Sequence, residues 1–180
     1  MAAVKTPMTA AGFRAAADAL FRAWNDHDVE AILERLTDDV AWIDPSLDEP
    51  ARGKEAVAAH LKDMFSSFTD LHLLTEDFHL FPNADEAAIV STWTLTGTMT
   101  GAFQETGIPA TGKHVKISGT NINRFRDGLI SEYVIVYDAL DFLQQLGALP
   151  RSDALGFKAL VLADVLLGKA TDQAMKVLHR

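Results

Sequence analysis

Two aspartates stand where a run of strand-forming residues ends. Asp44 closes VAWID, and Asp138 closes LISEYVIVYD. In each strand the alternation of side chains places the Asp on a face with large apolar neighbours, Trp42 for Asp44 and Val136 for Asp138. A buried carboxylate must be paired or employed. Burial is expected to raise its pKa, which suits a general acid/base, so both residues are catalytic candidates.

Each aspartate also has an ordinary structural explanation. Asp44 precedes Pro45, and aspartates often initiate turns at such a position. Asp138 precedes the apolar-periodic segment ALDFLQQLG, so its side chain can cap a helix there. The local pattern leaves both explanations open, and the occurrence of two such aspartates favours chemistry.

Two amides lie on an otherwise apolar strand face. In HVKISGTNINRF one face carries Val115, Ile117, Gly119, Asn121, Asn123 and Phe125. The asparagines indicate either a polar patch inside a cavity or simple hydrogen-bonding residues. Asn121 is a candidate donor to an oxyanion. The residues predicted to line the pocket or its rim are Trp42, Trp93, Met99, Phe103 and Phe65.

Other chemistries lack a matching pattern. The chain has no cysteine, which excludes disulfides and thiolate catalysis. Its six histidines are scattered and are predicted to lie mostly on the surface, so no metal site and no cofactor is expected. There is no G-x-S-x-G. GIPATGK departs from a phosphate loop, because His114 follows the lysine and KHVKIS is typical of a strand.

The spacing of apolar residues changes along the chain from a helical pattern to a strand pattern. Thr9 and Asp28 are predicted to cap two helices, and a third is predicted over residues 54–65. The pattern then alternates with period two in four segments, LHLLTEDFHLF, EAAIVSTWTLTGTMT, KHVKISGTNINRF and LISEYVIVYD. Turns are predicted at residues 82–83 and 127–128, and residues 101–112 form a long rim or lid loop.

Helices followed by hairpin-connected strands predict an α+β fold with a mostly antiparallel sheet. Residues 1–150 are expected to form one domain. Residues 151–180 are expected to form a C-terminal helical extension, broken near Gly168 and packed on the domain or on a partner subunit.

Net charge and the length of the apolar segments limit the classes of molecule that the protein is expected to bind. The formal net charge is −9 with no basic tract, which argues against nucleic acid and anionic membranes. The N-terminus lacks the apolar core of a signal peptide, and ALVLADVLLG is too short to span a bilayer. We expect a cytoplasmic protein whose partner is an apolar small molecule.

Several segments together resemble a known family. WNDHDVEAILERLTDDVAWIDP, RGKEAV, GTMTGAF, GIPATGK, NRFRDGLISEYVIVYD and QQLG span roughly residues 20–150. Their order resembles the cone-shaped α+β fold of nuclear transport factor 2, ketosteroid isomerase and scytalone dehydratase. The chain is most similar to the SnoaL-like polyketide cyclases. The resemblance implies a curved sheet with N-terminal helices packed over a cavity, and a homodimer.

The resemblance also assigns roles. It makes Asp138 the general acid/base of an intramolecular aldol ring closure. Asp44 matches the segment that carries the base of ketosteroid isomerases, and Asn121 falls near their second acid. Met99 stands where the cyclases usually have a histidine, and a thioether cannot donate a hydrogen bond.

These observations favour a cofactor-independent lyase or isomerase acting on an apolar, carbonyl-bearing small molecule. Two alternatives remain open at this point. One is a non-catalytic ligand-binding protein of the same fold. The other is an epoxide or ester hydrolase-like variant, which requires Asp44 and Asp138 to face each other across one cavity. The threonine-lined face of residues 90–100 is one possible dimer surface.

Overall fold

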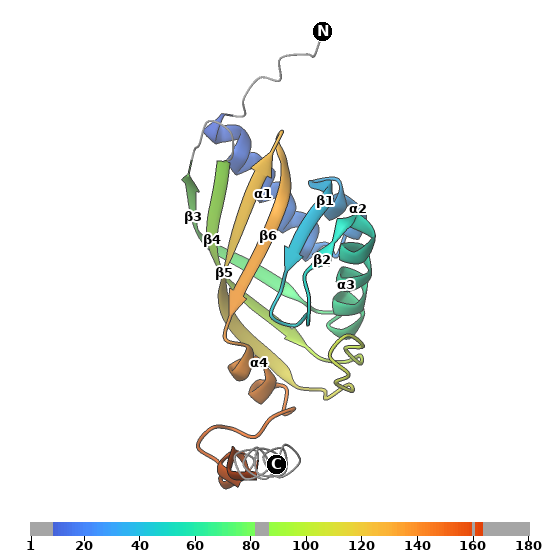
Figure 1. The fold of residues 1–180 in the computed structure, drawn as a ribbon, viewed down its shortest axis with the longest axis vertical. Coiled ribbons are helices and arrows are strands. Elements are labelled where there is room, and N and C mark those ends of the chain that lie inside the picture. Colours follow the sequence, from blue (N-terminus) through green and yellow to red (C-terminus); the bar gives the residue numbers. More distant parts are fainter. Residues whose placement is uncertain (1–8, 82–86, 160, 164–180) are drawn as a thin grey trace, which may run out of the picture.

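The computed structural model describes residues 9–81, 87–159 and 161–163 (Figure 1). Helices and strands follow in the order α1 (Ala10–Asn25), α2 (Val29–Leu33), β1 (Leu36–Ile43), β2 (Ala51–Arg52), α3 (Gly53–Ser67), β3 (His72–Phe81), β4 (Ala87–Thr98), β5 (His114–Arg126), β6 (Leu129–Tyr137) and α4 (Ala139–Gln145). The predicted succession of helices and then strands is confirmed.

The first two helices begin at the predicted residues. The Thr9 hydroxyl accepts a hydrogen bond from the Gly12 amide at 3.2 Å, and Asp28 accepts one from the Ala31 amide at 3.0 Å. Such caps satisfy amides that have no partner within the helix. At the far end of α1, the Asn25 side chain bonds both the amide and the carbonyl of Leu73. This pair fastens α1 to β3.

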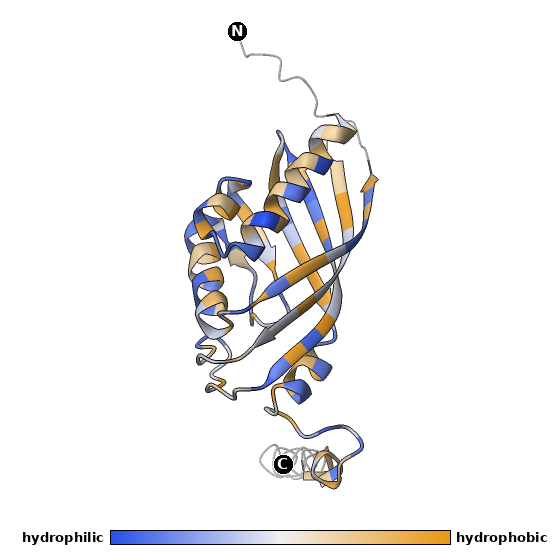
Figure 2. Ribbon diagram, turned by 180° about the vertical axis from the view of Figure 1, so that it is seen from behind, coloured by the Kyte–Doolittle hydropathy of each residue, from blue (hydrophilic) through white to orange (hydrophobic). Residues whose placement is uncertain are grey.

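The six strands form one open sheet in the order β2-β1-β6-β5-β4-β3. All neighbours are antiparallel except β1 and β6, which run parallel. The mostly antiparallel sheet is therefore confirmed. Residues 51–52, for which the sequence predicted no strand, form the short strand β2 paired with β1. Figure 2 shows α1 lying across the sheet, whose strands alternate hydrophilic and hydrophobic residues.

The inner faces of β4 and β5 carry the predicted residues. Ile89, Trp93 and Met99 are buried, as are Val115 and Phe125. Asn121 and Asn123 share this buried face. On β1 the predicted face is also correct, because Val40, Trp42 and Asp44 are all buried.

A bulge in the β5–β6 hairpin overturns one predicted face. The turn lies at Asp127 and Gly128, as predicted, and both have positive φ. Phe125 then pairs with Ile130 and Arg124 with Glu132, which leaves Ser131 as an extra residue.

An extra residue reverses the alternation beyond it. Tyr133 and Ile135 are therefore buried, whereas Val136 is 52% exposed. The prediction that Val136 and Asp138 share an apolar inner face is wrong for this reason.

The described part of the C-terminal extension is helical over residues 155–159 and 161–163, and it lies beyond α4 (Figure 1). Leu155 and Leu162 are exposed there. The predicted turn at residues 82–83 and the predicted break near Gly168 lie outside the described residues. None of the helices in the described ranges is long and apolar enough to cross a membrane.

Candidate functional site

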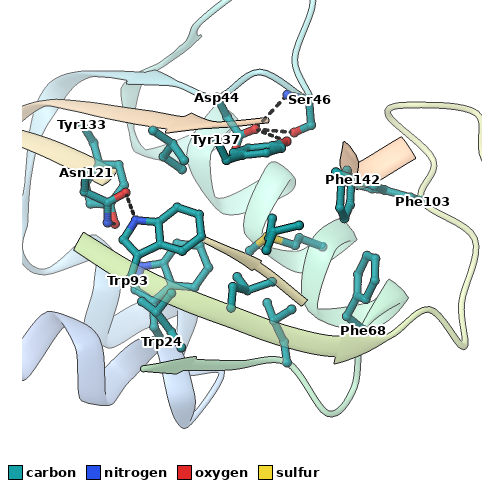
Figure 3. A pocket seen from close by; sticks show the side chains of 16 residues that line it. Trp24, Asp44, Ser46, Phe68, Trp93, Phe103, Asn121, Tyr133, Tyr137 and Phe142 are labelled. Atoms are coloured by element: carbon teal, nitrogen blue, oxygen red, sulfur yellow. Dashed lines mark hydrogen bonds between the residues drawn. The ribbon is translucent and has the colours of Figure 1, made fainter. Parts of the chain in front are cut away.

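A cavity lies between the inner face of the sheet and the helices that cover it (Figure 3). Its empty space, counted through the mouth into open solvent, is about 580 Å³. Most of the sixteen lining side chains are apolar. In Figure 3 Phe68, Phe103 and Phe142 lie on the side away from Asn121 and Trp93. The polar groups of the wall are those of Trp24, Asp44, Ser46, Trp93, Asn121, Tyr133 and Tyr137.

Asp44 lies directly after β1 and forms the first polar group. Its Oδ1 accepts hydrogen bonds from the Ser46 amide at 2.8 Å and the Ser46 hydroxyl at 2.7 Å. The Tyr137 hydroxyl donates to the same oxygen at a longer 3.4 Å. The turn considered as a structural explanation is therefore present. The carboxylate nevertheless lines the cavity, so the two explanations are compatible.

Behind Asp44 lies His60 of α3, which is fully buried. Its Nε2 lies 3.6 Å from Oδ2 of Asp44, within ion-pair range but too far for a full hydrogen bond. Its Nδ1 lies 2.5 Å from Oε2 of Glu105. The prediction that the histidines lie mostly on the surface is wrong at this position. The helical spacing of Val57, His60 and Leu61 was the signal, because it places all three on one buried face.

Opposing effects set the charges of this pair. Burial by itself lowers the pKa of His60, but Asp44 and Glu105 outweigh it and hold that pKa above its usual 6.5. Burial by itself raises the pKa of Asp44, but His60 and Ser46 outweigh it and hold that pKa below its usual 3.8. The expectation that the pKa of Asp44 is raised is therefore wrong, because the sequence did not reveal the histidine. At neutral pH the carboxylate is ionised.

A hydrogen-bonded chain forms the second polar group. The Trp93 indole donates to Oδ1 of Asn121 at 2.9 Å, and Nδ2 of Asn121 lies 2.5 Å from the Tyr133 hydroxyl oxygen. An indole N–H can only donate, so Asn121 must present its oxygen to Trp93 and its NH₂ to Tyr133. Tyr133 is thus an acceptor here, and its own hydroxyl proton remains to be donated.

Tyr133 is held in place and kept protonated. Its ring stacks on Trp42 with centroids 3.9 Å apart and an interplanar angle of 3°. Burial and the negative charge of Asp44 raise the pKa of Tyr133 well above its usual value. The hydroxyl therefore stays a neutral donor over the range in which proteins are assayed.

Asp138 lies elsewhere. It is exposed, it caps α4, and its Oδ1 accepts a hydrogen bond from the Asp141 amide at 3.0 Å. It is not among the residues that line the cavity. The bulge at Ser131 explains this placement, because it turns the even-numbered residues at the end of β6 outward. The structure does not bring Asp138 and Asp44 together around one cavity.

The other predicted pocket residues divide into two groups. Trp93 and Phe103 line the cavity. Trp42, Met99 and Phe65 are buried behind its wall. Trp42 supports Tyr133, Phe65 packs edge-on against Trp24, and the Met99 sulfur accepts a long hydrogen bond from the Thr111 hydroxyl.

The long connection between β4 and β5 forms part of the rim. Asp63 of α3 accepts hydrogen bonds from the amides of Gln104 and Glu105 at 3.2 and 3.0 Å. Phe103 bonds Ile108 across the loop at 2.9 Å. These contacts place Phe103 in the cavity wall and Glu105 on His60.

Sequence reasoning missed Tyr133, Tyr137 and His60. Tyr133, Ile135 and Tyr137 are spaced two residues apart, so the sequence indicated that they share a strand face. It did not indicate the bulge that turns this face inward. Among the described residues no group of three His, Asp or Glu side chains is arranged to hold a metal ion.

Comparisons with known proteins agree with this architecture. TsrD from Streptomyces laurentii is 26% identical, with a TM-score of 0.65 over 79% of this chain and 100% of that one. A protein from Jannaschia sp. CCS1, described as a SnoaL-like polyketide cyclase, is 21% identical, with a TM-score of 0.67 over 81% and 99%. TerC, crystallised with polyporic acid, is 17% identical, with a TM-score of 0.57 over 76% and 98%.

Among curated proteins none matches the chain. The family model described as SnoaL-like polyketide cyclase matches residues 14–146, which is most of the chain. The predicted resemblance is confirmed, and the chain belongs to the SnoaL-like polyketide cyclase family.

Proposed function

We propose that this protein is a cofactor-independent enzyme in which Asp44 is the general acid/base for an apolar, carbonyl-bearing small molecule. One observation carries the proposal. An ionised carboxylate stands in the wall of an apolar cavity that also contains a tyrosine hydroxyl with a proton to donate. This is the pair of groups that proton abstraction next to a carbonyl needs.

The geometry of Asp44 supports this role. Its Oδ1 is occupied by Ser46 and Tyr137, and Oδ2 is held only loosely, 3.6 Å from His60. We propose that Oδ2, which has no full hydrogen bond, is the oxygen that accepts the substrate proton. Because the pKa of Asp44 is held low, the carbon acid must be an acidic one, such as carbon flanked by two carbonyls.

The proposed step needs no external reagent. Asp44 takes the proton, and the electrons of the broken C–H bond pass to the carbonyl oxygen as an enolate. Tyr133 donates a hydrogen bond to that oxygen. The enolate carbon then attacks a second carbonyl of the same molecule, a C–C bond forms, and protonated Asp44 returns its proton to the new alkoxide. The result is an isomerisation by ring closure.

Tyr133 also replaces, on this proposal, the hydrogen-bond donor that a histidine at position 99 would supply. Met99 is buried behind the wall and accepts rather than donates a hydrogen bond. A donor to the enolate must therefore come from another residue, and the Trp93–Asn121–Tyr133 chain supplies one. Asn121 acts on this view by orienting Tyr133, instead of contacting the oxyanion as predicted from the sequence.

The test compares two aspartates. Steady-state rates against pH are measured on a panel of β-dicarbonyl compounds for the wild type, Asp44→Asn and Asp138→Asn. Loss of a general base typically costs about 10²–10⁴-fold, so Asp44→Asn should lose that much of kcat. Asp138→Asn should retain it, because asparagine is also a good helix cap. The opposite pattern would return the catalytic role to Asp138.

A non-catalytic binding protein is the second candidate. The bonds that already hold Asp44 and the methionine at position 99 favour it, and the fold relative TerC was crystallised with polyporic acid. Inactivity of the wild type on the whole panel, together with a co-purified ligand in native mass spectrometry, would support this candidate. The hydrolase-like variant has no such support, since Asp138 does not face Asp44 across the cavity.

Homodimerisation stays a prediction. The threonine-lined outer face of β4 is partly exposed and remains the proposed surface. Sedimentation at micromolar concentration tests it, and a monomer there would contradict it.

A further inference from the structure

We propose that His60 and Glu105 are positioning residues for Asp44, with Glu105 fixing the imidazole so that its Nε2 proton points at the carboxylate. The inference rests on the proposed role of Asp44 as the base. On this inference, His60 and Glu105 determine the pH range over which Asp44 works as a base.

Geometry is the first support. The side chain of His60 is 1% exposed and that of Asp44 is 7% exposed, so neither is free to turn toward bulk water. The short Nδ1 contact of 2.5 Å to Glu105 determines the ring orientation. Because Glu105 accepts at Nδ1, that nitrogen carries a proton, and Nε2 is the atom left to face Asp44.

Charge is the second support. A single imidazole lies between two carboxylates, which raise its pKa and favour the imidazolium form. When Asp44 takes a proton from its substrate it becomes neutral, and the remaining His60–Glu105 pair is neutral in sum. The buried histidine therefore keeps a partner in both protonation states of Asp44. Leaving a buried charge uncompensated is strongly unfavourable, and this arrangement avoids it.

The same arrangement makes neutral His60 unfavourable. Glu105 retains the Nδ1 proton, so the proton lost at high pH leaves from Nε2. The imidazole then presents a lone pair to the Asp44 carboxylate, which is a repulsive contact. We infer that the working form contains the imidazolium.

Other groups facing His60 do not change this assignment. Asp44 after β1 and Glu105 of the rim loop are the carboxylates that contact it. The neighbouring rings are Trp42 of β1 and Phe103 of the rim loop. Tyr137 of β6 reaches Asp44, where burial and the Asp44 charge raise its pKa well above the usual value.

Glu105 also connects the pair to solvent. Its side chain is 28% exposed, and it lines an outer groove together with Ser46, Asp48, Tyr137 and Phe142. Ser46, Tyr137 and Phe142 belong to the wall of the inner cavity as well. The two hollows therefore adjoin, and Glu105 lines the outer one but not the inner one.

The first test needs no substrate. Histidine-selective ¹⁵N NMR follows the His60 imidazole against pH in the wild type, Glu105→Gln, Glu105→Asp and Asp48→Asn. We expect the His60 titration to move to lower pH in Glu105→Gln, to be partly restored in Glu105→Asp, and to be unchanged in Asp48→Asn, which alters a groove carboxylate away from His60. An unchanged titration in Glu105→Gln would overturn the inference.

The second test uses rates on the β-dicarbonyl panel. Glu105→Gln should shift the alkaline limb of the kcat–pH profile to lower pH with little change in KM. At a pH that lies between the alkaline limbs of the wild type and the variant, kcat of the variant should be lower by up to about tenfold for each pH unit of the shift. An unmoved limb would overturn the inference. A wild type inactive on the panel would overturn the proposed function, whereas the NMR titration would still decide whether Glu105 controls His60.

Discussion

Asn121 and Asn123 offer a matched pair of positions on one strand. They lie two residues apart on the same buried face of β5, and their exposed fractions are 2% and 0%. Asn121 joins Trp93 to Tyr133, whereas neither amide atom of Asn123 makes a hydrogen bond within the described part of the chain. The same substitution to leucine should therefore have opposite consequences at the two positions.

The magnitudes follow from the hydrogen bonds. Asn121→Leu leaves the Trp93 indole without an acceptor and the Tyr133 hydroxyl without its donor. Each buried group so orphaned costs about 1–3 kcal/mol, which gives a central value of about 4 kcal/mol for the pair. For a chain of this length that corresponds to a melting temperature lower by roughly 8–16 °C. Asn123→Leu removes an amide with no partner, so the free energy of unfolding should stay the same or rise.

The assay is urea unfolding of both variants, followed by tryptophan fluorescence. Asn121 lines the cavity and Asn123 does not, so the difference between the variants reports the hydrogen bonds together with any difference in how leucine fits. Adding Trp93→Phe to Asn121→Leu should recover part of the loss, because it removes the orphaned donor. Equal destabilisation at both positions would refute the reasoning, since it would mean that the Asn123 amide has a partner too.

Three further predictions concern stability. The pKa of His60 is raised in the folded protein, so this group contributes stability at pH values below its unfolded pKa near 6.5, and that stability is lost as the pH rises through the folded pKa. Denaturant midpoints should therefore fall on the alkaline side, and they should fall less in Glu105→Gln. Gly119→Ala should cost about 1–3 kcal/mol in urea unfolding, because its Cβ would lie 2.4 Å from the Trp93 ring and 2.6 Å from the Val136 carbonyl oxygen. Asp138→Ala should cost about 1 kcal/mol through loss of the α4 cap, whereas Asp138→Asn should not; equal midpoints for these two variants would contradict the capping role.

Much of the fold was readable because its signals are local. Helix caps at Thr9 and Asp28, the turn at residues 127–128 and the alternation in β4 and β5 each depend on residues close in sequence. The site was only partly readable for the opposite reason. His60, Glu105 and Asp44 come from a helix, a loop and the end of a strand, and nothing local records that they meet. Only the burial of His60 was indicated, by its place on the apolar face of α3.

The two aspartates differ in a way that explains why one sequence pattern had two outcomes. Asp44 follows a strand whose inward face is continuous from Val40 through Trp42, so the alternation carries its carboxylate into the cavity. Asp138 follows a strand with one extra residue, and the same alternation carries its carboxylate out to cap α4. A bulge of one residue is small in energy, but it decides which strand-end carboxylate is buried. Burial by itself raises the pKa of Asp44, and His60 together with the Ser46 hydrogen bonds outweighs that effect. The histidine behind Asp44 and the serine beside it therefore both favour an ionised base in this cavity.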